Sequence, residues 1–446
     1  MSASETFEVA RPIFNPLGLD SFGLILFLIE FVPYLVAILV GLYFTIPTLS
    51  SKTGAKRAQR SVLLFVPGII VVLSLATFFC SWEDAYERGY KIFTTPSLRT
   101  KLEAYIETGE EDLHDILESG KYAPTFGYYE LRYLAKDLLR HTIFHTNSHN
   151  EENIDEGYNK GNDWFTYTLG ETMMYTSGLY PTGEETLEEA QNYKIDYVAD
   201  ALQIQPGHTV LDIGCGWTYV AKTLTEKYGA KVTGITLSKE QLKWGTEWNK
   251  DNGAKIHLQD AMQISERDDL PEGGFDRITS LEMAEHVGIR RYQEFLAKVR
   301  DLLKDDGIFY FQVAGLRRKW RYEDLCWGLF MGEHVFPGAD ASCPLGWVST
   351  QLERAGFEIQ RVHNMGNHYS RTLNHWLENW RSNEEKIVAK YGITAYRRWE
   401  VFLAWSVRAA RQGSSTLFMF TLTKADVMDE RRISSQDNLV PKDVNA

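Results

Sequence analysis

The stretch VLDIGCGW, residues 210–217, decides the fold, because an apolar run ends there in a glycine-rich turn. A helix-like segment at 220–228 follows the turn, and a second apolar run at 231–235 comes after it. This order predicts a β-α-β unit with a ligand site at the carboxyl end of the first strand. Glycines let the backbone approach a ligand closely, and the start of the helix offers free N–H groups. The stretch lacks the pattern G-x-x-x-x-G-K-[ST] of a phosphate-binding loop.

Further apolar runs continue this alternation of strands and helices. Strands are predicted at 275–281, 308–313, 357–362 and 417–422. Apolar spacing near 3.6 residues predicts helices at 98–106, 187–202 and 292–303. Strands that alternate with helices indicate an α/β fold with a mostly parallel sheet.

The composition excludes some classes of function. The chain has 446 residues, of which 44% are hydrophobic, so two or more structural units with a sizeable core are expected. A formal net charge of −13 argues against a nucleic-acid binder, because phosphate binding needs a basic surface. The cysteines lack the spacing of a zinc site, and no metal is expected; they are Cys80, Cys215, Cys326 and Cys343.

Five segments, in a fixed order, carry a resemblance to a known family. They are LEEAQ (187–191), VLDIGCGW (210–217), GITLSKEQ (234–241), EMAEHVG (282–288) and GNHYSRTL (366–373). As a set they resemble the cyclopropane-fatty-acyl-phospholipid synthase and mycolic-acid methyltransferase family. Together with two apolar segments near the N-terminus, the chain resembles the fungal sphingolipid 9-methyltransferases. The resemblance implies methylation of carbon 9 of the unsaturated sphingoid base of ceramide, in glucosylceramide biosynthesis, with S-adenosylmethionine as the methyl donor.

The resemblance also implies the fold and the order of the structural units. A Rossmann-like class I methyltransferase with a mostly parallel seven-stranded sheet is expected at 163–424. A mostly helical linker at 83–162 precedes this domain, and a disordered tail at 425–446 follows it.

The N-terminal part predicts attachment to a membrane. Two apolar segments, 22–46 and 61–81, are each long enough to cross the ~30 Å hydrocarbon core of a bilayer. We predict a transmembrane helical hairpin at 21–82 after a flexible tail at 1–20, with a re-entrant hairpin or buried core helices as alternatives. The basic loop between the segments favours a cytosolic loop, whereas a cytosolic cofactor favours a catalytic domain in the cytosol. We expect a multi-pass protein of the endoplasmic reticulum whose catalytic domain faces the cytosol.

The resemblance places the cofactor at the carboxyl ends of the first three strands. A Tyr-Thr pair would lie against the cofactor, the glycine turn would hold its amino-acid end, and the segments after the second and third strands would hold the ribose and the adenine. The implied residues are Tyr175, Thr176, Asp212, Gly214, Cys215, Gly216, Trp217, Thr236, Leu237, Ser238, Lys239, Glu240, Gln241, Gln259, Asp260 and Ala261. The family usually has a further glycine where this chain has Thr218.

Methyl transfer to an alkene sets the chemical demands on the site. The alkene is a weak nucleophile, so the sulfonium must be held in line with it in a dry pocket. Attack leaves a carbocation, which needs negative or π-electron stabilisation and a base that takes a proton. The resemblance makes Glu285 the leading base or cation stabiliser, with His286 and Tyr369 beside it and Ser406 at a further position of the site.

Three positions around the expected base differ from the cyclopropane synthases. Ser177 and Ser406 stand where those enzymes have cysteine, and Gln312 stands where they have histidine. The resemblance gives Glu285 and Tyr369 positions that line a bicarbonate site in the cyclopropane synthases, and these changes make a bound bicarbonate doubtful here. They favour proton loss that restores the double bond over ring closure. Cyclopropanation of an acyl chain, amine N-methylation and an inactive lipid-binding scaffold are the alternatives. Core packing is the alternative role for Tyr369, and a small helix residue for Ser406.

Overall fold

The computed structural model describes residues 97–122, 161–267, 270–318, 322–336 and 343–425. The predicted hairpin at 21–82 and the N-terminal tail lie outside these residues, as do most of the expected linker and nearly all of the C-terminal tail. Among the helices in these ranges, none combines the length and the apolar character that crossing a bilayer requires.

Seven strands of the described chain form one mixed sheet in the order β3-β2-β1-β4-β5-β7-β6. Their bounds are β1 (Thr209–Ile213), β2 (Lys231–Thr236), β3 (Lys255–Leu258), β4 (Phe275–Leu281), β5 (Leu303–Leu316), β6 (Phe357–Asn364) and β7 (Ser415–Lys424). The neighbours from β3 to β5 pair in parallel, and β7 runs antiparallel to both β5 and β6. The prediction of a mostly parallel seven-stranded sheet is therefore confirmed.

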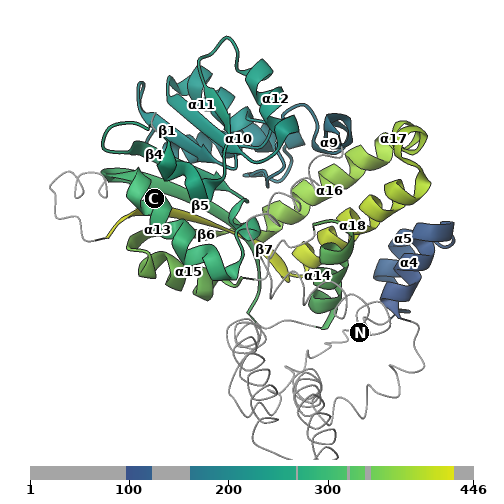
Figure 1. Cartoon of the computed structure of the whole chain (residues 1–446). Helices are drawn as coiled ribbons and strands as arrows, with labels where there is room; N and C mark the ends of the chain where they lie inside the picture. Colours follow the sequence, from purple (N-terminus) through teal and green to yellow (C-terminus); the bar gives the residue numbers. More distant parts are fainter. Residues whose placement is uncertain (1–96, 123–160, 268–269, 319–321, 337–342, 426–446) are drawn as a thin grey trace, which may run out of the picture.

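Helices accompany the strands in the predicted α/β order (Figure 1). They are α4 (Leu98–Thr108), α5 (Leu113–Glu118), α9 (Asn162–Leu169), α10 (Leu187–Ala201), α11 (Tyr219–Tyr228), α12 (Lys239–Trp248), α13 (Tyr292–Leu302), α14 (Tyr322–His334), α15 (Leu345–Arg354), α16 (Gly366–Ser382), α17 (Glu384–Tyr391) and α18 (Ile393–Arg411). Three short 3₁₀ helices are η3 (Ala261–Glu266), η4 (Ala284–His286) and η5 (Ile289–Arg291). The β-α-β unit predicted from residues 210–235 is β1-α11-β2.

Alternate residues of the central strands face two different hydrophobic cores. Val210 and Tyr310 pack in one core with residues of α10 and α11. Their neighbours Leu211 and Phe309 pack in the other core with residues of α13 and α15. Because side chains alternate along a strand, the sheet is covered on both faces, as a buried parallel sheet requires.

A third core joins helices that lie beside the sheet. Residues of α4, α5, α9, α14, α16 and α18 share it, with a group of tryptophans at its centre. Figure 1 shows α16 and α18 as a long pair, with α4 and α5 next to them. Tyr105 of α4 donates a hydrogen bond to Glu400 of α18 at 2.7 Å, and Arg408 of α18 donates to the carbonyl of Leu117. Helices α4 and α5 are therefore packed on the helical unit that contains α18.

The start of α10 is fixed by its own sequence. Thr186 Oγ1 accepts a hydrogen bond from the N–H of Glu189, and the Glu189 carboxylate accepts one from the N–H of Thr186. This reciprocal capping box satisfies two backbone donors that the first turn of a helix leaves open. Gln191 and Lys194 lie on the buried face of this helix.

Candidate active site

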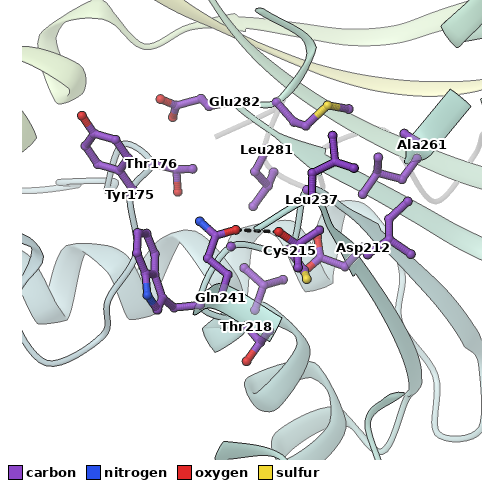
Figure 2. A pocket seen from close by; sticks show the side chains of 18 of the residues that line it. Tyr175, Thr176, Asp212, Cys215, Thr218, Leu237, Gln241, Ala261, Leu281 and Glu282 are labelled. Carbon is purple, nitrogen blue, oxygen red and sulfur yellow. Dashed lines mark hydrogen bonds between the residues drawn. The ribbon is translucent and has the colours of Figure 1, made fainter. Parts of the chain in front are cut away.

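A pocket opens at the carboxyl ends of β1, β2, β3 and β4 (Figure 2). Its wall contains thirteen of the predicted cofactor residues: Tyr175, Thr176, Asp212, Gly214, Cys215, Gly216, Trp217, Thr236, Leu237, Gln241, Gln259, Asp260 and Ala261. This is where parallel sheets place their ligands, because backbone and side-chain groups of several strands and loops converge there.

The glycine turn after β1 has a backbone that few other residues could adopt. Gly214 has a φ of +74°, and a Cβ atom at this position would lie 2.4 Å from Cγ of Met283. The N–H groups of Gly214 and Cys215 both donate to the carbonyl of Ile235, at 3.0 Å each, which fixes the turn against β2. The residues of the turn, Gly214, Cys215 and Gly216, line the pocket.

Thr236 and Gln241 form a polar pair on the second strand and the helix that follows it. Thr236 Oγ1 donates to Gln241 Oε1 at 2.6 Å, which leaves the amide N–H groups of Gln241 as available donors. Ser238 does not line the pocket, because its hydroxyl caps α12 by accepting from the N–H of Gln241 at 3.3 Å. Lys239 and Glu240 begin the same helix and also lie outside the pocket wall, so their cofactor role stays a prediction.

The segment after β3 closes the opposite end of the pocket. Gln259 donates its backbone N–H to the carbonyl of Thr236 at 2.9 Å, and Asp260 Oδ1 caps η3 by accepting from the N–H of Met262 at 2.8 Å. With Ala261, these residues form a wall that has apolar and hydrogen-bonding parts, as a nucleobase site needs.

Two carboxyl groups face the pocket from neighbouring strands. Asp212 ends near the glycine turn, and burial raises its pKa to about 7 although Lys194 opposes this shift. One of its oxygens, Oδ2, has no hydrogen-bond partner among the described residues. Glu282 follows β4, and burial raises its pKa as well. A buried acceptor without a partner is costly, so the geometry suits a ligand that brings a cationic donor.

The predicted catalytic residues do not all meet at this pocket. His286 lines it, and burial lowers the pKa of its imidazole to about 4, so the ring is neutral near pH 7. Glu285 lies behind the wall in η4, Tyr369 lies on α16 against the helical core, and Ser406 lies on α18. The hydroxyl of Ser406 accepts a hydrogen bond from Trp327 Nε1 at 3.2 Å.

Glu285 is held by one oxygen only. The N–H of Ala314 on β5 donates to Glu285 Oε1 at 2.5 Å, while Oε2 is buried and has no partner within the described part of the chain. Burial, reinforced by the nearby charge of Glu282, raises the pKa of Glu285 to about 8. This arrangement leaves one oxygen able to exchange a proton.

Two of the three altered family positions converge on Glu282. The N–H of Ser177 donates to Glu282 Oε1 at 2.8 Å, and the side-chain amide of Gln312 donates to the same oxygen at 2.6 Å. The motif EMAEHVG (282–288) contains two acids, Glu282 and Glu285. Nothing in the sequence indicates that Glu282 is the one that lines the pocket.

Sequence reasoning missed two buried side chains of α10 beneath the pocket. Gln191 Nε2 donates to the carbonyl of Thr176 at 2.7 Å, and Lys194 Nζ donates to the hydroxyl of the same residue. Both side chains are fully buried. The available signal was a lysine at the spacing of the apolar positions Ile195 and Val198, which indicates the inner face of the helix.

The residues of the pocket fit S-adenosylmethionine. The unpaired oxygen of Asp212 can accept from the ammonium group of the cofactor, and the amide of Gln241 can donate to a ribose hydroxyl. The open glycine turn lets the amino-acid end approach the backbone closely. Both residues, Asp212 and Gln241, line the pocket.

Comparisons with known proteins agree with this geometry. The family model described as "Mycolic acid cyclopropane synthetase" matches residues 145–420. The chain is 46% identical over 301 residues to "Sphingolipid C9-methyltransferase 2" of Gibberella zeae, covering 66% of this chain and 57% of that protein. It is 42% identical over 374 residues to "Sphingolipid C9-methyltransferase" of Candida albicans, covering 77% of this chain and 72% of that protein.

A solved structure supports the fold. The mycolic acid cyclopropane synthase CmaA1, complexed with SAH and CTAB, has a TM-score of 0.58 and 28% identity to this chain, covering 61% of this chain and 98% of that one. The described sheet and helices are therefore those of a class I methyltransferase that uses S-adenosylmethionine. The order of the motifs, the position of the pocket and the extent of the matches lead to one conclusion: the chain belongs to the mycolic acid cyclopropane synthetase family and, within it, to the sphingolipid C9-methyltransferases.

Proposed function

We propose that this protein transfers a methyl group from S-adenosylmethionine to carbon 9 of the unsaturated sphingoid base of a ceramide, within glucosylceramide biosynthesis. The similarity to the C9-methyltransferases of Gibberella zeae and Candida albicans supports the substrate class. The observation that supports methyl transfer from S-adenosylmethionine is the pocket at the carboxyl ends of β1 to β4. Within the described residues, Oδ2 of Asp212 is buried there without a hydrogen-bond partner.

The pocket residues divide the binding of the cofactor between them. The turn at Gly214 and Gly216 and the carboxyl group of Asp212 hold the amino-acid end. Gln241, supported by Thr236, holds the ribose, and Asp260 with its neighbours encloses the adenine. When bound, S-adenosylmethionine supplies the methyl group as an electrophile, and its sulfur keeps the electron pair of the broken bond.

Glu285 is the proton acceptor in this proposal. Methylation of an alkene leaves a positive charge on the adjacent carbon of the lipid, and an apolar pocket cannot solvate that charge. An ionised Glu285 stabilises it and then takes the proton from the methylated carbon, which restores the double bond. The bond from Ala314 holds one carboxylate oxygen in place and leaves the other for the proton. His286 stays neutral and contributes to the pocket wall.

The altered positions Ser177 and Gln312 favour methylation over ring closure. Gln312 donates its side-chain amide to Glu282 and is engaged in holding that carboxylate, whereas Ser177 donates only its backbone N–H to Glu282 and its hydroxyl to the carbonyl of Gly178. Neither contributes to a separate anion site around Glu285, where the cyclopropane synthases are expected to bind bicarbonate. With Glu285 as the base, the proton leaves the chain carbon and the new methyl group stays intact.

Membrane attachment is part of the proposal. The apolar segments at 22–46 and 61–81 are long enough to form a hairpin, and a ceramide substrate resides in a bilayer. We place the protein in the endoplasmic reticulum with its catalytic domain facing the cytosol. Protease treatment of sealed microsomes tests the orientation, because a cytosolic domain is digested without detergent and a lumenal domain is protected.

The decisive experiment follows the hydrogen atoms of the transferred group. Microsomes carrying the protein are incubated with methyl-deuterated S-adenosylmethionine and a 4,8-diene ceramide, and the lipids are examined by mass spectrometry. A branch at carbon 9 that keeps all three deuterium atoms is the expected product. A product with two deuterium atoms would assign ring closure instead, and labelled amines would assign N-methylation. The absence of label from every lipid, with cofactor binding intact, would favour the scaffold alternative.

A further inference from the structure

The side chain of Trp217 reaches from the glycine turn into the helical core. Trp217 follows Gly216 and lines the cofactor pocket, yet it is 2% exposed and packs among the residues of the third core. Phe165 of α9 lies against its indole, with ring centroids 4.6 Å apart. One wall of the pocket is therefore supported by α9, which precedes the whole sheet in the sequence.

The indole N–H of Trp217 has its acceptor on the same helix. Trp217 Nε1 donates to Oδ1 of Asn162, the first residue of α9, at 2.8 Å. The amide of Asn162 donates in turn through Nδ2 to Oε2 of Glu240, on the first turn of α12, at 3.4 Å. A side-chain amide offers an acceptor and a donor side by side, so one orientation of the group satisfies both contacts. Asn162 thus links the turn after β1 to the helix after β2.

The next residue of α9 connects to a different part of the molecule. Asp163 accepts hydrogen bonds from Lys390 at 2.6 Å and from the hydroxyl of Tyr391 at 2.9 Å, both at the end of α17. Asp163 does not line the pocket. Two adjacent polar residues of α9 therefore have separate contacts, one to the cofactor side and one to the helical side.

We propose that Asn162 is a positioning residue that holds the indole of Trp217 in the wall of the cofactor pocket, and that Glu240 acts on cofactor binding only through Asn162. Glu240 follows the second strand, where a ribose ligand is expected, but it lies outside the pocket wall and its carboxylate contacts Asn162 instead. The inference rests on the cofactor of the proposed function and adds to its site two residues outside the pocket wall.

Loss of the Asn162 amide is expected to change how often the wall has the conformation that binds the cofactor. The indole N–H of Trp217 would be buried without its acceptor, which favours orientations of the ring in which water reaches that group. A ligand that needs the original orientation then binds with an affinity reduced by the fraction of molecules that retain it. Asn162→Leu should therefore raise the dissociation constant of S-adenosylhomocysteine about ten-fold.

Titration calorimetry with the full-length protein in detergent separates positioning from a purely structural role. A structural defect lowers the fraction of molecules that bind and leaves the dissociation constant of the others unchanged, whereas a positioning defect raises the dissociation constant at constant stoichiometry. Asp163→Asn is the matched control, because it weakens the contact of α9 with α17 and leaves Asn162 in place. Its dissociation constant should stay within about two-fold of the wild-type value.

An exchange of the two polar groups gives a second test. In Asn162→Asp the carboxylate still accepts from Trp217, but it faces Glu240 without a donor between them, so binding should weaken. Adding Glu240→Gln supplies an amide donor and removes the repulsion. The double variant should therefore return to within about three-fold of the wild-type dissociation constant. Glu240→Gln alone keeps an acceptor for Asn162 and should weaken binding less than Asn162→Asp does.

An unchanged dissociation constant in Asn162→Leu would overturn the inference. So would a large loss in Glu240→Gln that persists in the double variant, because Glu240 would then be a direct ligand of the cofactor. If Asn162→Leu does not fold, equal constants in Asn162→Asp and the double variant would decide against the inference. A wild-type protein that binds no cofactor would instead overturn the proposed methyltransferase function, so the two failures are distinct.

Discussion

The side chain of Thr218 occupies the space that any side chain at position 245 would need. A Cβ atom at Gly245 would lie 2.4 Å from Cγ2 of Thr218. Thr218 has a φ of +72° at the start of α11, at a position where the family usually has glycine. Its hydroxyl accepts a hydrogen bond from Asn249 Nδ2 at 2.8 Å, which ties it to the end of α12. The threonine of the turn therefore fits because Gly245 on the facing helix has no side chain.

This pairing predicts coupling between two substitutions. Gly245→Ala is expected to lower the free energy of unfolding by ~1–3 kcal/mol through overpacking against Thr218. Thr218→Gly relieves the positive φ and removes the clash, so the double variant should recover most of that loss. Urea unfolding followed by tryptophan fluorescence gives the four free energies of the cycle.

Gly346→Ala in α15 is the control for this cycle, because a Cβ atom there would have no heavy atom within 4 Å of its surroundings. It should stabilise the protein slightly, since alanine is the better helix former by ~1 kcal/mol. Strictly additive effects at positions 218 and 245 would contradict the coupling.

Glu285→Gln is expected to keep cofactor affinity within about three-fold and to lower methyl transfer by at least ~10²-fold, because a carboxamide cannot take the proton. Calorimetry with S-adenosylhomocysteine and labelled-lipid assays measure the two quantities separately. Unchanged turnover would remove the catalytic role.

The pH dependence of the wild-type reaction should report the same group. The pKa of Glu285 is raised to about 8, so the carboxyl group is protonated below that pH and ionised above it. A base acts only when ionised, and kcat/KM should therefore increase as the pH rises through about 8. The Glu285→Gln variant should lack this rise.

Ser406→Ala separates a structural role from a catalytic one. The Ser406 hydroxyl is engaged with the indole N–H of Trp327 in the helical core. Its removal leaves that buried donor without its acceptor, which costs ~1–3 kcal/mol of stability, while turnover stays within about two-fold. Thermal unfolding and the labelled-lipid assay measure the two effects. A loss of turnover above ~10²-fold in a protein of unchanged stability would restore Ser406 to the catalytic site.

Arg99 should be among the most sensitive positions outside the sheet. Its side chain is 1% exposed and donates to Glu103 at 2.7 Å and to Glu333 of α14 at 2.8 Å. Arg99→Met removes the arginine from both carboxylates, although Glu103 keeps its contact with His334 Nε2 at 2.9 Å, and is expected to lower the free energy of unfolding by ~3–5 kcal/mol.

Lys101→Met on the same helix removes an ion pair with Glu111 that lies at the surface, at 2.6 Å. A much smaller effect is expected there, because exposed pairs are screened by water. Urea unfolding compares the two variants, and equal losses would show that burial does not decide the strength of the Arg99 contacts.

Local patterns predicted much of the fold. The bounds of β4 at 275–281 agree with prediction, because the strand begins and ends at apolar residues, Phe275 and Leu281, and the turn-forming pair Gly273 and Gly274 precedes it. Strand β5 was predicted at 308–313 but runs from Leu303 to Leu316. The polar residues Lys304, Asp305 and Asp306 conceal its beginning, and only pairing with β4 and β7 reveals its full length.

The sequence predicted which backbone segments form the site, but it did not predict which charged side chains are buried beside it. The glycine turn and Gln241 lie on the pocket because strand order alone brings them together. Ser238 caps α12 and lies outside the pocket wall, so its role in cofactor binding stays a prediction. Lys194 looked like one of many helix lysines, and the residue that its ammonium group contacts, Thr176, lies in a segment before α10. Its role depends on contacts between separate segments, which a short stretch of sequence does not show.

Helices α4 and α5 precede residue 145, where the family match begins, yet Leu98, Leu102 and Ile106 share a core with the tryptophans of α18. A fragment that begins at residue 145 would lack α4 and α5, and the apolar residues of α18 that these helices cover would be exposed to solvent. Such a fragment should aggregate on purification, and fusing a tag at residue 145 would not cure it. For engineering, a shortened enzyme needs α4 and α5, because these helices cover the hydrophobic face of α18.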